Sequence, residues 1–441
     1  MPKFLHLADV HLGFTKYDSP ERTKDFFYAL QDAIQKHALE AAVDFVLIAG
    51  DLFEQRQVLP ATLNQAQLCL TPLQEAGIPV LAIEGNHDYR PYGTQTSWLR
   101  YLSSWGVLKL LEPNEHEGLE PWSDAEMSGG YIDLPCGVRV IGSRWYGAAA
   151  PQAIAKLAVE IERLPVGPPF TVMMFHHGLE GQIARYSGAL RYQDFLPLKE
   201  AGVDYLALGH IHRNYSLENW IFNPGSIEAN SVAENQEQNP RGVYLVELSP
   251  HGVKAELKQD YEQRNIVRLS LQSDPNQTAA ELEQEAIAAI QTAADRGKTE
   301  NAIVELRIHG SIGFDRSDLD IRTLRSRLQD LSKALIFLLK YDAIGREFQT
   351  YIDTEDELPS RLDIERTVFT DFLVANVNYR DTAETLVQGL LDLKTRVLNQ
   401  QPEDELYGFV ETLLAQTQSA SLSDGSAVNL DSIEDSSGKQ A

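Results

Sequence analysis

Residues 44–51 read Asp-Phe-Val-Leu-Ile-Ala-Gly-Asp, an apolar run that stops at a glycine and a carboxylate. A near-continuous apolar run of this length is typical of a strand that is buried on both faces of a sheet. Four more runs of the same form occur in the first half of the chain, at 4–8, 79–83, 171–175 and 205–208. Helical stretches such as 23–42 and 61–76 separate them. The pattern predicts an α/β domain over residues 1–250, with layered β-sheets flanked by helices.

A polar motif follows each of these five apolar runs. The motifs are Asp9-Val10-His11, Gly50-Asp51, Gly85-Asn86-His87-Asp88, His176-His177 and Gly209-His210-Ile211-His212. Six of the eleven histidines fall inside them. A buried histidine needs a partner, and reactive residues in such folds lie at the carboxyl ends of the strands. The sequence therefore predicts one polar site where these strand ends meet.

The Asp, Asn and His side chains of the motifs fit two metal ions held side by side. Asp51 is the candidate bridge, because a carboxylate can offer one oxygen to each ion. The ligand sets we predict are Asp9, His11, Asp51 and His212 for one ion, and Asp51, Asn86, His176 and His210 for the other. Nitrogen and oxygen donors without thiolate favour manganese, iron or zinc. Two such ions activate a water molecule and clamp a phosphate.

His87 is predicted to act on the substrate rather than to bind metal. An imidazole beside the ions can protonate the departing oxygen, and Asp88 is expected to orient that imidazole. His177 is expected to be structural or to support a ligand, and the isolated His6 and His37 to be packing or surface residues. Each motif alone has an ordinary structural explanation, such as a turn for Gly-Asp. All five in this order, each after a buried strand, favour the metal site.

Residues 264–341 change character and predict a small independent α/β unit. The expected elements are strands at 265–271, 302–308 and 334–340 and helices at 278–296 and 318–332. Strand 302–308 alternates, so that its apolar residues should face one way and Glu305 and Arg307 the other. Residues 361–416 carry helical apolar stripes. Residues 419–441 are mainly Ser, Asp and Gly, and we expect them to be disordered.

The composition bears on partners and compartment. The net charge of −26 argues against tight binding of nucleic acid, although two divalent ions would offset it locally and residues 301–350 carry eight Lys/Arg against seven acids. No signal peptide and no membrane span are expected, because no apolar run reaches 18 residues. Cys69 and Cys136 lie outside any metal spacing and predict free thiols in a reducing cytoplasm.

The five motifs, in this order, resemble those of the calcineurin-like metallophosphoesterases over about residues 1–250. His11-Leu12-Gly13, Gly50-Asp51-Leu52-Phe53 with Pro60, and Asn223-Pro224-Gly225-Ser226 are similar to one branch, the DNA double-strand-break repair exonucleases of the SbcD type. The resemblance implies manganese as the activating ion, the metal-ligand roles given above, and the catalytic role of His87. It also implies a capping domain that touches DNA, matching 264–341. An ABC-type ATPase with a long coiled coil would then dock on helices within 361–416.

Three functions follow from this reading. The first is a two-metal DNA exonuclease or endonuclease that acts in DNA repair with the ATPase. The second is a calcineurin-like phosphatase or phosphodiesterase for a small-molecule or protein substrate, which would have little need of the residues after 264. The third is a non-catalytic scaffold for the ATPase, which the complete ligand set disfavours. A homodimer is a further partner to consider. For docking of the ATPase, the expected anchors are Phe369, Phe372, Leu390 and Leu393.

Overall fold

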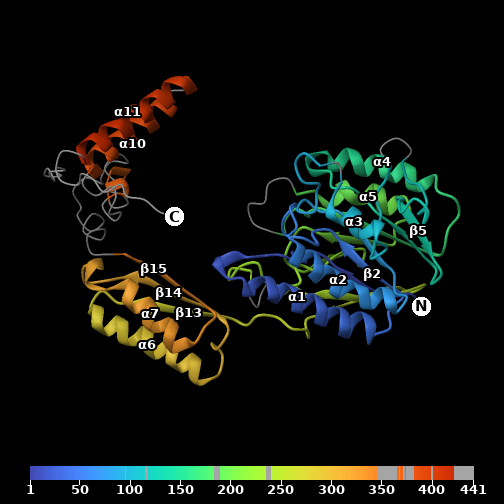
Figure 1. The fold of residues 1–441 in the computed structure, drawn as a ribbon, viewed down its shortest axis with the longest axis horizontal. Helices are drawn as coiled ribbons and strands as arrows, with labels where there is room; N and C mark the ends of the chain where they lie inside the picture. Colours follow the sequence, from blue (N-terminus) through green and yellow to red (C-terminus); the bar gives the residue numbers. More distant parts are fainter. Residues whose placement is uncertain are drawn as a thin grey trace, which may run out of the picture. The chain divides into compact units, whose positions relative to one another are not determined.

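The computed structural model divides the chain into two compact units, Met1–Ala343 and Ile344–Ala441. It describes residues 1–94, 96–114, 118–182, 189–234, 240–344, 365–366, 368–370, 373, 382–398 and 401–421. The first unit contains three β-sheets with their helices (Figure 1). Among the described residues, none of the helices combines the length and the apolar character that a membrane crossing requires.

The first sheet is built around three parallel strands that follow one another in the chain. The strand order is β12 (Gly252–Lys258), β11 (Val243–Ser249), β1 (Lys3–Leu7), β2 (Phe45–Ala49), β3 (Val80–Ile83) and β4 (Lys109–Leu110). β1, β2 and β3 pair in parallel, whereas β11 and β12 run antiparallel at one edge. Every residue of β2 and β3 is buried, as the unbroken apolar runs predict.

The second sheet faces the first and also has a parallel centre. Its strand order is β5 (Tyr131–Leu134), β6 (Val138–Ile141), β7 (Phe170–His176), β8 (Tyr205–Gly209), β10 (Ile221–Asn223) and β9 (Tyr215–Leu217). The strands from β6 to β10 pair in parallel, and β5 and β9 are antiparallel edge strands. The residues of β7 from Val172 to His176 are buried, because this strand lies at the centre.

The two sheets pack face to face and each is covered outside by helices. Between them Phe4 stacks on Phe45 at 4.7 Å and meets the edge of Tyr205 at 5.2 Å. Helices α1 (Glu21–Ile34), α2 (Pro60–Glu75) and α3 (Trp98–Ser104) cover the first sheet, and α4 (Ala150–Glu162) and α5 (Tyr192–Glu200) cover the second. Figure 1 shows α4 and α5 on the opposite side of the sheets from α1. This confirms the predicted α/β class with layered sheets.

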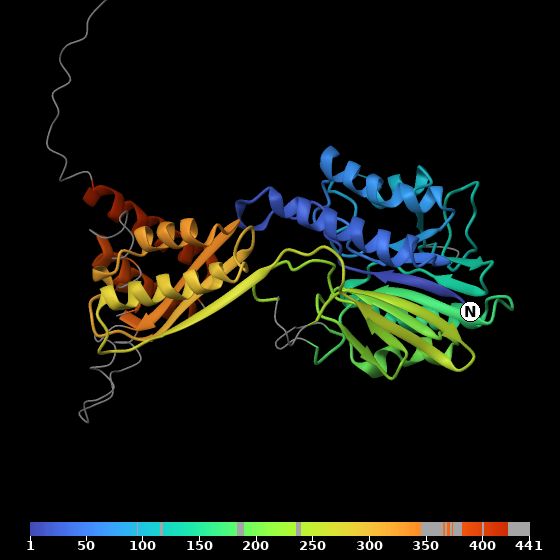
Figure 2. The same cartoon turned by 90° about the horizontal axis from the view of Figure 1, so that it is seen from below.

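The third sheet contains β13 (Ile266–Ser273), β14 (Ile303–Ser311) and β15 (Ile336–Ile344) in that order. Helices α6 (Ala279–Asp295) and α7 (Ile321–Ser332) pack on one of its faces around a core that includes Leu306 and Phe337 (Figure 2). α6 starts where it does because Thr278 and Glu281 form a reciprocal cap. These elements fall close to the ranges expected from the sequence.

Glu305 lies on the face of β14 that the alternation predicts, and it is buried there. It lies on the same side of β14 as Arg307, but it is 2% exposed. Arg268 of β13 contacts it at 3.1 Å and Lys340 of β15 at 2.6 Å, so the two neighbouring strands cover its carboxylate. The alternation in the sequence therefore predicts correctly which face of the sheet carries Glu305. Its burial depends on the charged side chains of the two neighbouring strands.

The second unit contains two described helices, α10 (Ala383–Leu398) and α11 (Glu403–Ser421). They pack closely, because Gly389 of α10 leaves room for Leu413, which is buried. Phe372 and residues 374–381 of the predicted segment lie outside the described residues. So do residues 422–441 of the tail expected to be disordered, whereas 419–421 are helical.

A buried ion-pair network ties α1 to the chain that leads into the third sheet. Asp25 of α1 is 5% exposed and accepts hydrogen bonds from Arg22 at 2.7 Å and from Nε of Arg264 at 3.0 Å. Arg264 also donates to the backbone carbonyl of Asn301 at 2.8 Å, and the guanidinium of Arg22 has no exposed surface. One carboxylate therefore pairs with the fully buried Arg22 and with Arg264, whose side chain is 25% exposed.

We expect Asp25→Ala to lower the free energy of unfolding by about 3–5 kcal/mol, because it leaves a buried guanidinium without its charge partner. Asp32→Ala on the same helix removes a partly exposed pair with Lys36 and should cost about 1 kcal/mol or less. Urea denaturation of the two variants measures both values. Equal losses would show that the Asp25 network does not stabilise the fold.

Candidate metal centre

The polar motifs meet at the carboxyl ends of the parallel strands of both sheets. Asp9 and His11 follow β1, Asp51 follows β2, and Asn86 and His87 follow β3. His176 ends β7, and His210 and His212 follow β8. Because the sheets pack face to face, their strand ends lie together, and Nε2 of His176 from the second sheet lies 3.2 Å from the carboxylate of Asp51 from the first. The structure thus brings all seven predicted ligands to one place.

The backbone at this place is held in unusual conformations. Asp9, His11, Asp51 and His210 have positive φ angles of 51°, 52°, 55° and 82°. Such angles are uncommon for residues other than glycine and concentrate at functional sites. The loops are fixed by backbone hydrogen bonds, including His11 N–H to the Asp51 carbonyl at 3.0 Å. Hydrogen bonds between the loops therefore hold these strained residues in place.

Asp9, His11 and His212 form the first group of donors. Nε2 of His11 lies 3.1 Å from Nε2 of His212, and the ligand atoms of the three residues lie within 4.8 Å of one another. Asp9 is oriented by the backbone N–H of His210, which donates to its carboxylate at 2.9 Å. Two imidazole nitrogens and a carboxylate directed at one point suit a divalent cation.

Asp51, His176 and His210 form the second group, and Asn86 adds an amide oxygen. The Asn86 Oδ1 atom lies 3.2 Å from Nε2 of His176 and 2.9 Å from Nδ1 of His210. The Nδ1–H of His176 donates to the carbonyl of Ala49 at 2.8 Å, which leaves the lone pair of Nε2 on the side of the cluster. These donors have the composition of the second predicted metal site.

The electrostatics of the centre fit a cation. Burial disfavours the charged form of Asp51, but the neighbouring His176 outweighs burial and lowers the pKa of the carboxyl below its usual range. Burial likewise works against the cation of His176, yet the charge of Asp51 raises its pKa to about 9. Burial and the neighbouring His176 lower the pKa of His210 to about 3, which keeps that ring neutral and able to coordinate. The neighbouring His11 and His87 also help to lower the pKa of Asp51.

His87 lies beside the centre, as predicted, but Asp88 does not orient it. The backbone N–H of His87 donates to Asp51 at 2.9 Å, and its ring Nδ1 lies 2.6 Å from the carbonyl of Glu54. Asp88 instead accepts three backbone N–H groups, from Leu52, Phe53 and Gly85. It joins the loops after β2 and β3, so its role is positional. Burial and the nearby Asp51 charge raise the pKa of the Asp88 carboxyl to about 7.

The structure adds three residues that the sequence reading did not single out. The carboxylate of Glu54 lies 2.8 Å from Nδ1 of His11, and that of Glu234 lies 3.4 Å from Nδ1 of His212. Carboxylates in this position commonly fix the ring of a metal-binding histidine. Trp145 packs on three histidines of the centre. Glu54 follows Asp51 by three residues and could have been found, whereas nothing in the local sequence marks the other two.

The other histidines behave as expected. His177 is buried, lies 3.3 Å from the carbonyls of Gly178 and Gly147, and is absent from both donor groups. His6 contacts the hydroxyl of Tyr205 at 2.9 Å, and burial lowers the pKa of its ring to about 3. His37 is buried beside Tyr261. These three rings are packing residues.

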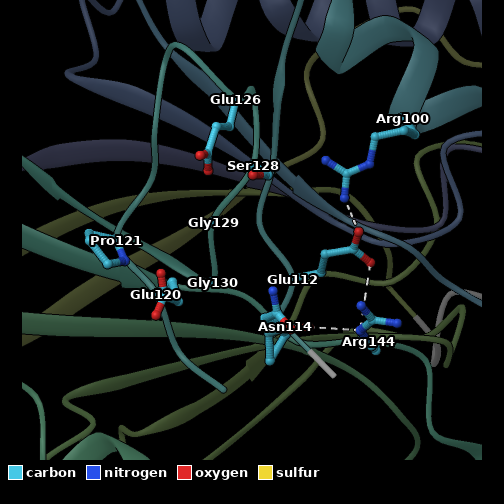
Figure 3. A pocket seen from close by; sticks show the side chains of 11 residues that line it. Arg100, Glu112, Asn114, Glu120, Pro121, Glu126, Ser128, Gly129, Gly130 and Arg144 are labelled. Carbon is cyan, nitrogen blue, oxygen red and sulfur yellow. Dashed lines mark hydrogen bonds and ion pairs between the residues drawn. The ribbon is translucent and has the colours of Figure 1, made fainter. Parts of the chain in front are cut away.

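A polar cavity of about 320 Å³ lies apart from the donor groups, between α3 and the chain from 112 to 130 (Figure 3). Glu112 at its wall pairs with Arg100 and lies 3.8 Å from Nε of Arg144. None of the predicted ligands lines it. The cavity is thus separate from the predicted chemistry.

The close approach of Gly85 to Asp51 gives a test of the centre. A Cβ atom at position 85 would lie 2.1 Å from Oδ1 of Asp51, so Gly85→Ala must displace that carboxylate. We expect the variant to bind Mn²⁺ roughly tenfold or more weakly, as for the loss of groups that orient ligands. Gly408→Ala in α11 is the control, because nothing lies within 4 Å of its added atom and its backbone is helical. Isothermal titration calorimetry decides, and unchanged affinity in Gly85→Ala would contradict the predicted ligand role of Asp51.

Comparisons with known proteins agree with this geometry. Residues 2–214 match the family model described as calcineurin-like phosphoesterase. The chain is also similar to curated proteins named DNA double-strand break repair protein Mre11. That of Archaeoglobus fulgidus is 31% identical over 53% of this chain and 51% of its own length, and that of Aeropyrum pernix 46% over 48% and 49%. That of Methanococcus maripaludis is 26% identical over 80% of this chain and 91% of its own length.

The match with the first of these relatives spans about half of its length. The family model ends at residue 214, beyond the last predicted ligand, so it includes every motif from Asp9 to His212. The resemblance seen in the motifs is confirmed. Residues 2–214 of this chain form a domain of the calcineurin-like phosphoesterase family.

Proposed function

We propose that the protein is a two-metal phosphodiesterase that cleaves DNA in repair, as an exonuclease or endonuclease. The observation that carries the proposal is that two groups of nitrogen and oxygen donors meet at the strand ends of the two sheets, with the carboxylate of Asp51 in one of them. A divalent ion in each group would share this carboxylate. The similarity to proteins named for DNA double-strand break repair supports DNA as the substrate.

The residues present determine how such a site would work. Asp9, His11 and His212 would hold one ion, and Asn86, His176 and His210 the other, with Asp51 shared. Two bound ions supply an activated water and charge stabilisation at the phosphate. Manganese suits the mixed nitrogen and oxygen donors, and neither Cys69 nor Cys136 belongs to the described donor groups.

His87 would provide the proton for the leaving oxygen. Its Nδ1 is held by the carbonyl of Glu54, so the ring direction is fixed before substrate binds. Its side chain is 36% exposed, whereas the side chain of His176 is buried, so His87 is open to a substrate. A general acid in this place contributes on the order of 10²–10⁴-fold to turnover.

The C-terminal parts support a role beyond a small-molecule hydrolase. The helix-free face of the third sheet carries Arg268, Arg307 and Lys340, which pair with Glu305 and Asp342, and we propose that this face is the DNA-contacting surface of the cap. In the second unit, α10 and α11 bury part of the predicted apolar stripe against each other but leave Val397, Tyr407 and Leu414 53%, 67% and 48% exposed. We propose that this surface docks on a coiled-coil ABC-type ATPase.

Two further expectations from the sequence remain proposals. The free thiols of Cys69 and Cys136 are consistent with a cytoplasmic protein, and burial raises the pKa of Cys69 to about 12, which makes that thiol unreactive. The homodimer remains a prediction.

The catalytic assignment is tested with purified protein and Mn²⁺ on linear duplex DNA, single-stranded DNA and a small phosphodiester. His87→Ala should keep both ions and lose roughly 10²–10⁴-fold in kcat. Asp51→Ala should lose both ions, and chelation of the wild type should abolish activity. Loss of metal from His87→Ala in step with activity would show that His87 is a ligand. Hydrolysis of small phosphoesters without DNA cleavage would favour the alternative, a phosphatase or phosphodiesterase for other substrates.

The partner is tested by co-purification with the ATPase. Tyr407→Glu places a charge on the exposed face of α11 and should abolish the complex while the thermal midpoint and nuclease activity stay near wild type. Thr385→Glu, at an exposed polar position of α10, is the control and should still bind. If Tyr407→Glu retains the complex at wild-type affinity, the docking surface is elsewhere.

A further inference from the structure

Trp145 forms an aromatic wall on one side of the metal centre. It follows β6, and its ring centroid lies 5.7 Å from that of His176 and 5.3 Å from that of His210. These are two of the proposed ligands of a single ion. A molecule that reacts at this ion therefore lies within reach of the indole ring.

The direction of the indole is fixed before any substrate arrives. Trp145 stacks on His177 at 5.8 Å with an angle of 22° between the rings, and His177 is itself buried against the carbonyls of Gly147 and Gly178. The ring of Trp145 is only half-buried, so part of it is open to solvent. A rigid aromatic surface beside a reacting phosphate costs little to organise on binding.

A second aromatic group, Tyr89, belongs to the same loop as Asn86 and His87. The ring of Tyr89, two residues after His87, is 39% exposed. The guanidinium of Arg56 lies 5.4 Å from its centroid and that of Arg90 5.6 Å, and Arg56 also donates to the carbonyl of Asn86 at 3.4 Å. Two exposed cations therefore stand beside His87 on a chain with a net charge of −26.

Together these surfaces match the parts of a nucleic acid strand. Phosphates are attracted to arginines, and bases stack on aromatic rings in a way that tolerates any sequence. A protein phosphoester or a small phosphate monoester would not need both surfaces. The indole of Trp145 contacts His210 of the second donor group, and the ring of His87 contacts His11 of the first group, with centroids 5.0 Å apart.

We propose that Trp145 stacks the base next to the scissile phosphate, and that Arg56 and Arg90 bind the phosphate backbone near His87. Trp145 is then a specificity-determining residue that recognises the presence of a base without reading its identity. The proposal rests on the proposed DNA cleavage and adds the groups that contact the base and the backbone at the centre.

The stacking is tested with a cycle of protein and substrate changes. The substrates are single-stranded oligonucleotides with every base present or with one abasic residue on the 5′ or the 3′ side of the cleaved linkage. For the wild type, one abasic position should raise KM roughly 5- to 100-fold, the range expected for one stacked base. For Trp145→Ala the intact and abasic substrates should have equal KM values, because the partner ring is gone. Trp105→Ala, which removes a 50% exposed tryptophan directly after α3, is the control.

Trp145→Phe separates stacking from support of the histidines. It keeps a smaller ring and should keep part of the discrimination, with manganese content and thermal midpoint equal to the wild type. Discrimination that persists in full in Trp145→Ala, or an equal loss on intact and abasic substrates in both variants, would overturn the stacking. Failure of the wild type to cleave any DNA would overturn the proposed function itself.

The arginines are tested by salt dependence. Arg56→Ala with Arg90→Ala should weaken binding of every oligonucleotide and lower the slope of log affinity against log salt by roughly 1–2, about one per lost phosphate contact. Arg163→Ala, an exposed arginine after α4, should leave the slope unchanged. A double variant with the wild-type slope would place the backbone elsewhere.

Discussion

The contact between His176 and Asp51 is the constraint on which the rest of the site depends. It joins the strand ends of two different sheets at 3.2 Å in a place where both side chains are buried. A buried carboxylate beside several imidazoles is stable only if charge is balanced, by a shared proton or by a cation. The face-to-face packing of the sheets, through Phe4, Phe45 and Tyr205, keeps these strand ends together. The chemistry proposed for the protein therefore depends on the sandwich core as much as on the ligands.

Much of this arrangement could be predicted from the sequence, for physical reasons. Strands buried on both faces must be apolar throughout, which makes runs such as 45–49 easy to recognise. Polar residues that directly follow such strands must lie where the carboxyl ends of the strands meet. This locates Asp9, Asp51 and His210 without knowledge of the strand order. Two peripheral elements were not predicted from the sequence. The edge strand β12 alternates exposed and half-buried residues, so it has no apolar run, and the short helix α3 has little helical periodicity.

The residues around the ligands could not be predicted in the same way. Asp88 was expected to orient His87, but its carboxylate is used by three backbone N–H groups of two loops. The hydrogen-bond partner of a loop side chain depends on the three-dimensional arrangement of the loops. A residue adjacent in sequence is not more favoured as a partner than a residue of another loop. Trp145 and Glu234 come from loops far from their partners in the chain and carry no motif. The candidate ligands could be identified from sequence motifs, whereas these two residues that support them could be identified only from the structure.

The central claim is that two metal ions share Asp51, and anomalous diffraction from crystals grown with Mn²⁺ tests it most directly. The account predicts two manganese peaks roughly 3.5–4 Å apart, one beside His11 and His212 and the other beside His176 and His210, with a carboxylate oxygen of Asp51 on each. A single peak in this place, or two peaks with Asp51 bound to only one of them, would contradict it.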